Sequence, residues 1–212
     1  MNPQPVILEG SHVRLEPLDL RHAADLYAVG GDERIWRYMP RAKLASITDA
    51  QEMIESAKAA AADGSQIPFA IIERRSSRAV GSTRYLDIRR KDRGLEIGWT
   101  WLGSAYQRTP INTECKYLLL RHAFEALDAV RVQLKTDLRN EGSQKAIERL
   151  GAIREGALRK HMILWDGFIR DTVYYSILHD EWPSVRRRLE ALLERRESPD
   201  RAATPLSRRR VK

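Results

Sequence analysis

The stretch LEIGWTWLGSAYQRTPINTE, Leu95–Glu114, decides the fold, because it joins a strand, a loop and the start of a helix. Residues 95–102 have the composition of a strand. Strict alternation predicts one face made of Leu95, Ile97, Trp99 and Trp101, and an opposite face made of Glu96, Gly98 and Thr100. From residue 111 to 127 the apolar residues recur at helical spacing. A basic, hydroxyl-rich loop that leads into a helix N-terminus is a candidate anion-binding site.

The segments on either side predict a mixed α/β chain without internal repeats. A short strand at residues 12–18 precedes two helices, the second capped by Thr48 or Asp49, with a loop at residues 33–40 between them. Strands at residues 68–73 and 79–88 complete a meander with residues 95–102. After the central helix we expect a strand at residues 132–136, a helix that ends at Gly151, and a hairpin turning at Asp166-Gly167.

Length and composition indicate a single globular domain. The chain has 212 residues, of which 42% are hydrophobic and 31% charged, and this size suits one hydrophobic core better than two. No window reaches the roughly 18 to 20 apolar residues of a membrane span, and the first residues lack a signal-peptide pattern, so we expect a cytoplasmic protein. The single cysteine, Cys115, is expected to be a core residue.

The net charge of +8 is concentrated near the C-terminus. Residues 181–212 contain ten Lys and Arg against five Asp and Glu, which leaves +5 in that segment. We predict a C-terminal helix at residues 184–197 and a basic flexible tail at residues 198–212. Arg208–Arg210 could contact RNA or an acidic partner, although a solvated tail is the commoner outcome.

Three segments carry a resemblance to a known family: residues 96–99, residues 107–114, and Asn140-Glu141-Gly142-Ser143. Together with the order of the elements, they resemble the GNAT acyltransferases, and among them the RimJ/RimL-like group. The resemblance covers residues 6–183. It implies an α/β GNAT fold with a mixed central sheet of about seven strands flanked by helices, acetyl-CoA as acyl donor, and direct attack by a primary amine on the thioester.

The resemblance places the coenzyme A pyrophosphate at the loop from Gln107 to Thr113. In the family this loop has the pattern Gln/Arg-x-x-Gly-x-Gly/Ala, whereas this chain has Pro110 and Asn112 at the two small-residue positions. Proline fits the first turn of a helix but offers no N–H. The family also implies that the strands at residues 95–102 and 132–138 splay apart. The residues expected to bind the cofactor are Trp99, Trp101, Leu102, Gln107, Arg108, Thr109, Ile111, Asn112, Thr113, Asn140 and Ser143.

Two side chains are candidates for catalysis. A carboxylate at Glu96 could take a proton from the amine, directly or through water; the alternative is a structural ion pair with an arginine. The helix at residues 141–150 lacks the tyrosine that many family members use as an acid. The Asn-x-x-Ser pattern suggests that the Ser143 hydroxyl bonds to the leaving sulfur, while Asn140 is equally well explained as an N-cap that binds the N–H of Ser143.

For the acceptor, the family resemblance points to Trp36, Tyr38 and Met39 together with Glu96, although such aromatic residues are as often core residues. The five histidines are dispersed, so we expect no metal. Two rival functions stay open, a catalytically silent acyl-CoA-binding module and a ribosome- or RNA-associated module that acts through the basic tail. A homodimer is common in the family, and the identity of the amine and the acyl chain length are left open.

Overall fold

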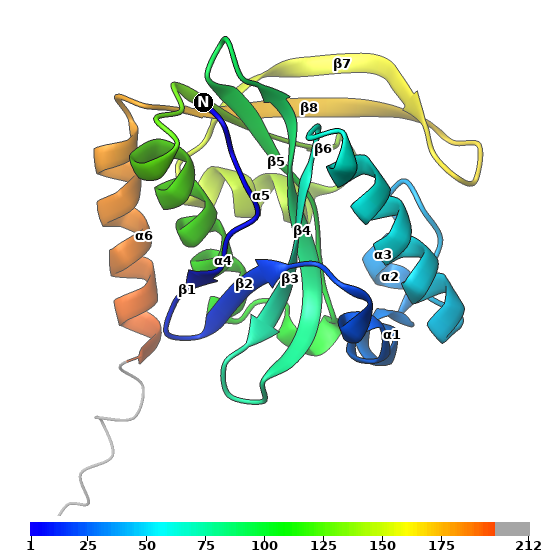
Figure 1. The fold of residues 1–212 in the computed structure, drawn as a ribbon. Helices are drawn as coiled ribbons and strands as arrows, with labels where there is room; N and C mark the ends of the chain where they lie inside the picture. Colours follow the sequence, from blue (N-terminus) through cyan, green and yellow to red (C-terminus); the bar gives the residue numbers. More distant parts are fainter. Residues whose placement is uncertain (198–212) are drawn as a thin grey trace, which may run out of the picture.

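The protein is built on one eight-stranded sheet, with strand order β1-β2-β3-β4-β5-β6-β8-β7, and helices cover both faces (Figure 1). The computed structural model describes residues 1–197, so the predicted tail at residues 198–212 lies outside the described residues. The strands are β1 (Leu8–Glu9), β2 (Val13–Pro17), β3 (Ile67–Glu73), β4 (Arg78–Arg89), β5 (Gly94–Leu102), β6 (Arg131–Asp137), β7 (Ile153–Ile163) and β8 (Ile169–Leu178). The helices are α1 (Ala23–Gly30), α2 (Glu33–Trp36), α3 (Ile47–Ala62), α4 (Pro110–Arg121), α5 (Glu141–Leu150) and α6 (Trp182–Glu197).

All neighbouring strands are antiparallel except β5 and β6. These two parallel strands pair only across residues 94–96 of β5 and residues 131–133 of β6. Beyond these residues β5 continues to Leu102 and β6 to Asp137 without pairing to each other. The sheet is therefore split between the C-terminal halves of β5 and β6, as the family resemblance implied.

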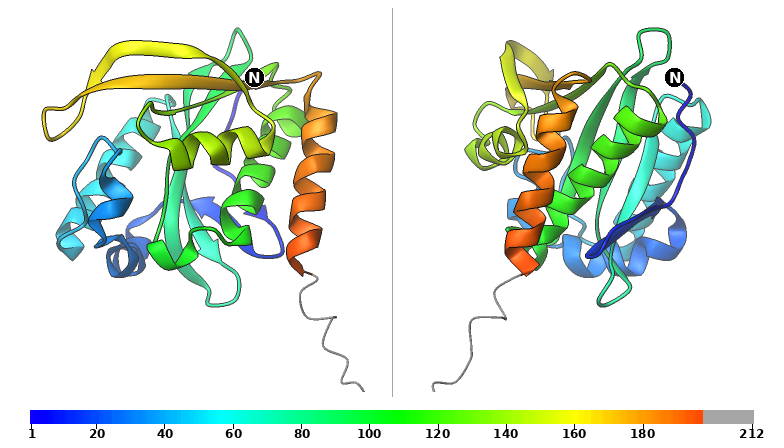
Figure 2. Two further views of the ribbon diagram at one scale, coloured as in Figure 1. Left: turned by 180° about the vertical axis from the view of Figure 1, so that it is seen from behind. Right: turned by 90° about the vertical axis from the view of Figure 1, so that its left-hand side faces the viewer.

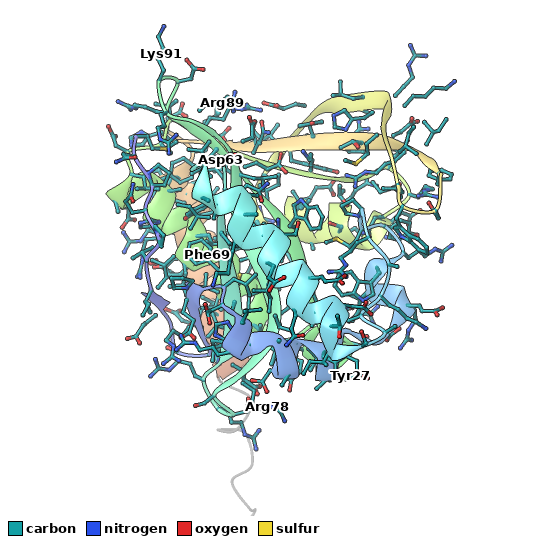
Figure 3. The ribbon with its side chains drawn as sticks, turned by 45° about the vertical axis from the view of Figure 1, so that its right-hand side comes forward. Tyr27, Asp63, Phe69, Arg78, Arg89 and Lys91 are labelled. Atoms are coloured by element: carbon teal, nitrogen blue, oxygen red, sulfur yellow. The ribbon has the colours of Figure 1, made fainter. Side chains whose placement is uncertain are left out.

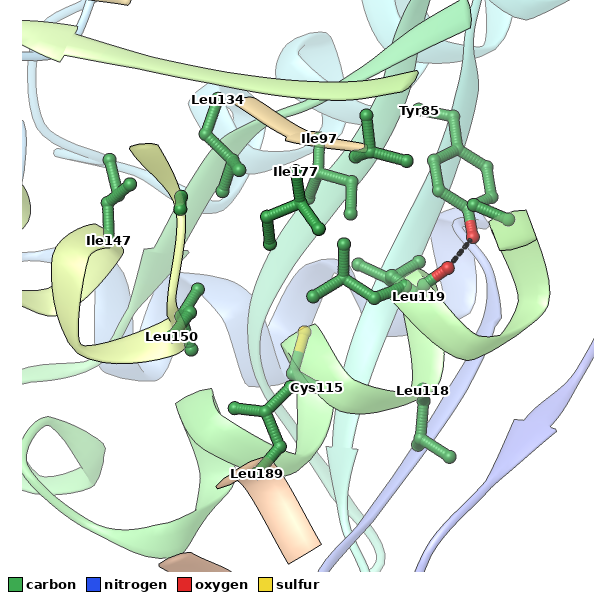
Figure 4. Packing of buried hydrophobic residues seen from close by; sticks show 14 of the residues in the cluster. Tyr85, Ile97, Cys115, Leu118, Leu119, Leu134, Ile147, Leu150, Ile177 and Leu189 are labelled. Carbon is green, nitrogen blue, oxygen red and sulfur yellow. Dashed lines mark hydrogen bonds between the residues drawn. The ribbon is translucent and has the colours of Figure 1, made fainter. Parts of the chain in front are cut away.

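The larger core lies between the sheet and α4, α5 and α6. Figure 4 shows Cys115 of α4 next to Leu189 of α6, and Cys115 is fully buried, which confirms its predicted role. The hydroxyl of Tyr85 donates to the carbonyl of Leu119 at 2.6 Å, so the one polar atom of this ring is satisfied inside the core. Burial of these side chains holds the helices against the sheet.

A second, smaller core lies under α1 and α3 on the opposite face. It contains Leu26, Ile54 and the neighbouring rings of Trp36 and Trp101, whose centroids are 4.8 Å apart. The two views in Figure 2 show the two sets of helices on opposite sides of the sheet. In Figure 3, α3 lies in front of β3, with Asp63 at its C-terminal end. These two helices cover the β3 and β4 side of this face.

A bulge in β5 makes the predicted alternation wrong for the second half of the strand. Ser82 pairs with Trp101 and Arg84 pairs with Gly98, so two steps along β4 match three along β5. Trp99 takes up the extra residue with a left-handed φ of 50°. Trp101 therefore packs in the second core instead of sharing a face with Leu95.

Several element ends also differ from the prediction. The N-cap of α3 is Ser46, not Thr48 or Asp49, because Ser46 and Asp49 form a reciprocal capping box. Residues 33–36, expected in a loop, form the short helix α2, capped by Asp32. The helix expected at residues 111–127 ends as α-helix at Arg121 and continues as one π-helical turn.

Glu114 fastens α4 to the N-terminal strands. Its buried carboxylate accepts three backbone N–H groups, from Ser11, His12 and Val13, at 2.7 to 2.8 Å. Gly10 is required beside it, because a Cβ at that position would lie 2.4 Å from the carboxyl carbon of Glu114. The carboxylate thus satisfies the turn between β1 and β2.

We predict that Glu114→Ala lowers the free energy of unfolding by about 2 to 4 kcal/mol, because it leaves three buried or half-buried N–H groups unpaired. Urea denaturation followed by circular dichroism measures this. Glu52→Ala, at an exposed position of α3, is the control and should be close to neutral. Equal stability of the two variants would contradict the role of Glu114.

Candidate functional site

The loop after β5 leads into the N-terminus of α4, which lies at the open end of the split sheet. Gln107 Nε2 donates to the carbonyl of Leu102 at 3.2 Å, and Thr109 Oγ1 donates to that of Tyr106 at 2.7 Å. Thr109 is also the N-cap of α4, whose first residue is Pro110. Proline suits this position because its N–H would have no helical acceptor there. The loop is therefore ordered by its own side chains.

The groups that this N-terminus can offer to an anion are mainly backbone groups. The N–H groups of Ile111 and Asn112 lie in the first turn of α4 and have no backbone acceptor within the helix; that of Ile111 donates only to Thr109 Oγ1, at 3.4 Å. The Thr113 side chain is buried and its hydroxyl accepts from Arg149, while Ile111 packs in the core. Arg108 is exposed, with a left-handed φ of 62°. A diphosphate would thus meet amide groups and one guanidinium.

β5 presents an unpaired edge to the gap beside β6. From Ile97 to Leu102 its backbone is not hydrogen-bonded to β6, although the β4 side remains paired. An extended ligand with amide groups can pair with such an edge as an added strand does. Gly98 leaves room for the carboxylate of Glu96, because a Cβ at position 98 would lie 2.7 Å from Glu96 Oε1. The edge and the helix N-terminus together can hold an elongated, phosphate-bearing molecule.

Glu96 is the buried carboxylate of this gap. It is 1% exposed and lies on the last residue of β5 that pairs with β6. Its Oε2 is 3.0 Å from Lys135 Nζ and 3.0 Å from Gln133 Nε2. The ion pair with Lys135 is the structural alternative to catalysis, with a lysine in place of the expected arginine. The ion pair does not exclude a role as proton acceptor, because it uses Oε2, whereas Oε1 is directed towards Gly98.

A buried lysine of α4 donates a hydrogen bond to the bulged part of β5. Lys116 of α4 is 6% exposed and donates through Nζ to Thr100 Oγ1 at 2.5 Å. Thr100 also shares a hydrogen bond of 2.7 Å with Thr83 of β4. Burial lowers the pKa of the Lys116 ammonium to about 8. The side chain therefore spans from α4 to the bulged residues next to Glu96.

The N-terminus of α5 follows the end of β6. Asn140 is the N-cap and its Oδ1 accepts the N–H of Ser143 at 3.0 Å, which confirms the capping interpretation. Ser143 is half-buried, and the cap uses its backbone N–H. Its hydroxyl makes no hydrogen bond within residues 1–197, so it is available to a ligand. The two strands that diverge are thus each followed by a capped helix N-terminus.

The predicted acceptor residues occupy different environments. Trp36 is 1% exposed and donates through Nε1 to the carbonyl of Gly30, so it lies in the core together with Trp101. Met39 and Tyr38 are half-buried. The Tyr38 ring lies 5.5 Å from the Arg139 guanidinium, and its carbonyl accepts from Arg170 at 3.4 Å. Tyr38 is therefore the member of this group that faces the split strands.

Sequence reasoning missed most of the polar side chains around Glu96. They come from β4, β6, β7 and β8, and include Arg84, Gln133, Lys135, Asp137, His161, Arg170 and Thr172. On β6 and β8 they alternate with the core residues Val132, Leu134 and Val173. Polar residues at every second position of these strands were the available signal.

A sheet split between two parallel strands, with a helix N-terminus at its open end, defines the architecture of an acyltransferase that takes its acyl group from coenzyme A. Residues 12–153 match the model of the acetyltransferase (GNAT) domain. The chain belongs to the GNAT acetyltransferase family, and the family predicted from the sequence is confirmed. Members of this family use acetyl-CoA.

Individual relatives support this assignment. The chain is 29% identical over 170 residues to YdaF of Bacillus subtilis, whose name assigns it provisionally as a ribosomal N-acetyltransferase; the match covers 79% of this chain and 90% of YdaF. A solved acetyltransferase structure from T. thermophilus is 42% identical, with a TM-score of 0.83, and the match covers 91% of this chain and 100% of the other. RimJ from Mycobacterium smegmatis, solved with CoA-disulfide, shares the fold at 23% identity and a TM-score of 0.74, over 89% and 93% of the two chains.

Among residues 1–197, no three His, Cys, Asp or Glu side chains come together as a metal site would require. No helix in that part of the chain combines the length and the apolar composition needed to cross a bilayer.

We predict that Lys116→Met stabilises the protein by about 1 to 3 kcal/mol at pH 7, because methionine avoids burying an ammonium. The pKa falls from 10.5 to about 8 on folding, so this cost is fully present below pH 8. It is relieved between pH 8 and 10.5, where the unfolded chain binds the extra proton. Thermal unfolding at pH 7 and pH 10 should show the gain only at the lower pH. Exposed Lys91→Met is the control, and an equal gain at both pH values would refute the prediction.

Proposed function

We propose that this protein transfers an acetyl or other short acyl group from acyl-CoA to a primary amine, carried by a protein N-terminus or a small molecule. One observation carries the proposal: the unpaired edge of β5 begins directly after Glu96, a buried carboxylate. A donor that lies along this edge brings its thioester to the proton acceptor that the amine needs. The family membership supports the acetyl donor.

The donor would be held in two places. Its diphosphate suits the first-turn N–H groups of Ile111 and Asn112, and Arg108 adds a positive charge. Gln107 and Thr109 shape the loop. Its pantetheine arm suits the edge from Ile97 to Leu102, which includes the residues Trp99, Trp101 and Leu102 proposed from the sequence. Bound acyl-CoA supplies the activated acyl carbon.

Glu96 and Ser143 would move and hold protons. The carboxylate of Glu96 accepts a proton from the amine, directly or through one water, so that the lone pair becomes available. Lys135 and Gln133 fix one oxygen of Glu96, and the other oxygen stays directed towards Gly98. The hydroxyl of Ser143 donates a hydrogen bond to the leaving sulfur. Asn140 supports this by fixing the first turn of α5.

The remaining assignments are proposals of the same kind. The domain spans residues 6–183 and acts in the cytoplasm. Tyr38 and Met39 form the wall on the acceptor side, and Trp36 supports them from the core, where Met39 packs against its cluster. A homodimer is supported by exposed apolar side chains on the β7–β8 hairpin, including Leu158, Ile163 and Trp165.

The silent acyl-CoA-binding module is the alternative that Pro110 favours, because proline removes one N–H from the loop. Contact with nucleic acid is assigned only to the basic tail.

We predict that Glu96→Gln lowers kcat by about 100-fold or more, the scale of a lost general base, and leaves coenzyme A affinity nearly unchanged. Steady-state kinetics across a panel of amines, with calorimetric titration of coenzyme A, measures both quantities. Glu155→Gln is the matched control, because Glu155 is a carboxylate paired with Arg131 at the far end of the same face. An unaltered kcat in Glu96→Gln would remove Glu96 from catalysis.

We predict that Arg108→Ala weakens coenzyme A binding by about 1.5 to 3 kcal/mol, the scale of a charge-assisted hydrogen bond. Calorimetric titration with coenzyme A and with dephosphorylated pantetheine separates the contribution of the diphosphate, since only the former should respond. Exposed Arg75→Ala in the β3–β4 turn is the control for net charge. Equal affinity of Arg108→Ala and wild type would place Arg108 outside the diphosphate site.

A further inference from the structure

Three guanidinium groups gather around the loop between α2 and α3, residues 37–46. Arg41 belongs to this loop, and Arg170 of β8 donates to its Tyr38 carbonyl at 3.4 Å. Arg84 of β4 lies close enough to Arg41 for the charge of Arg41 to contribute to lowering the pKa of Arg84. Arg84 and Arg170 are 5% and 6% exposed, so neither charge is fully solvated.

Arg84 is the least satisfied of the three. Its guanidinium lies 4.5 Å from the centroid of the Trp99 ring, and one terminal nitrogen donates to Gln66 Oε1 at 3.0 Å. Its Nε is buried without a hydrogen-bond partner. Its position opposite Gly98 puts it on the Glu96 face of the sheet. Burial, and to a smaller extent the charge of Arg41, lowers the pKa of Arg84 to about 10.

The other two guanidiniums are held by neutral groups. Arg170 donates to Thr172 Oγ1 at 3.0 Å and to the Tyr38 carbonyl. Arg41 donates to the carbonyls of Ala42 and Asp49, and its guanidinium lies 5.4 Å from the Trp36 ring centroid. Burial lowers the pKa of both arginines. Carboxylates farther away partly offset both charges, Asp49 and Glu52 that of Arg41, and Asp137 and Glu96 that of Arg170. The charge that acts on Arg84 is that of Arg41, which has the same sign, so Arg84 is the least compensated of the three.

The buried carboxylates nearby are already occupied. Glu96 is paired with Lys135, and Asp137 accepts from Arg139 at 2.7 to 3.0 Å. Within residues 1–197, no carboxylate lies within ion-pair distance of Arg41, Arg84 or Arg170. Burying a guanidinium without an anion is unfavourable, and an anion that binds to it compensates this penalty. Arginine is well suited to carboxylates, because its planar fork matches their geometry.

We propose that the acceptor carries a carboxylate next to its amine, and that Arg84, with Arg41 and Arg170 around the same loop, binds this carboxylate. This inference rests on the proposed acyl transfer and deepens it by naming the class of acceptor. The carboxylate belongs either to a free amino acid or to an acidic side chain near a peptide N-terminus. Both sources present the same group to the arginines.

Matched substrate pairs test the inference and separate the two sources. The free amino acid arm compares alanine with alaninamide, and the peptide arm compares Ala-Asp-amide with Ala-Asn-amide. In at least one pair the acid should exceed its amide twin by about tenfold or more in kcat/KM, the scale of one charge-assisted hydrogen bond. Arg84→Met and Arg170→Met should each reduce this ratio to about threefold or less, and Arg84→Lys should retain part of it.

Exposed Arg75→Met, with the same loss of charge, should keep the full ratio. A separate binding arm titrates the CoA-loaded protein with succinate, which should bind to wild type about tenfold more tightly than to Arg84→Met. Equal use of acid and amide twins, or a ratio that persists in both methionine variants, would overturn the inference while acyl transfer itself stands. Coenzyme A binding without turnover of any amine would reject the proposed function. In that case the succinate titration alone decides whether the anion site exists, and its failure rejects the inference.

Discussion

The structure depends on the parallel contact between β5 and β6, which is limited to three residue pairs. A longer contact would close the sheet and leave no edge for a donor, and a shorter one would separate the two halves of the core. The bulge at Trp99 and Thr100 turns β5 just where the contact has ended. Lys116 of α4 and Thr83 of β4 both hydrogen-bond to Thr100, so these bonds hold the diverging part of β5 against β4 and α4.

Buried charges are the second organising feature, and they are compensated by different groups on the two faces of the split sheet. On the α4 side, Glu114 is satisfied by three backbone N–H groups, so its charge serves the fold. On the opposite side, Glu96 and Asp137 are paired with Lys135 and Arg139. Burial alone would raise the pKa of Asp137, but the hydrogen bonds from Arg139 outweigh it and lower the pKa. This face therefore carries paired carboxylates next to the guanidiniums of Arg84 and Arg170, whose hydrogen bonds go to neutral groups.

Much of the architecture could be predicted from the sequence, because it depends on local signals. The Asp166-Gly167 turn, the Asn140 cap and the apolar stripe of α4 each identify an element without tertiary information. The bulge could not be predicted, because nothing local distinguishes Trp99 from a regular strand residue. Glu96 could be predicted because it lies in the family-like segment at residues 96–99. Arg84 and Arg170 were missed, because only the register of β4, β5, β6 and β8 brings them to the face of Glu96.

The excess of cations near Glu96 also bears on the chemistry of the amine. A positively charged surrounding disfavours an ammonium ion and therefore lowers the pKa of a bound amine. The same arginines would repel a simple amine, so they assist deprotonation only if another part of the acceptor compensates their charge. A carboxylate beside the amine meets both requirements, because it offsets the guanidiniums around residues 37–46 and leaves the proton to Glu96. Acceptor selection and amine activation would then follow from one arrangement of charges.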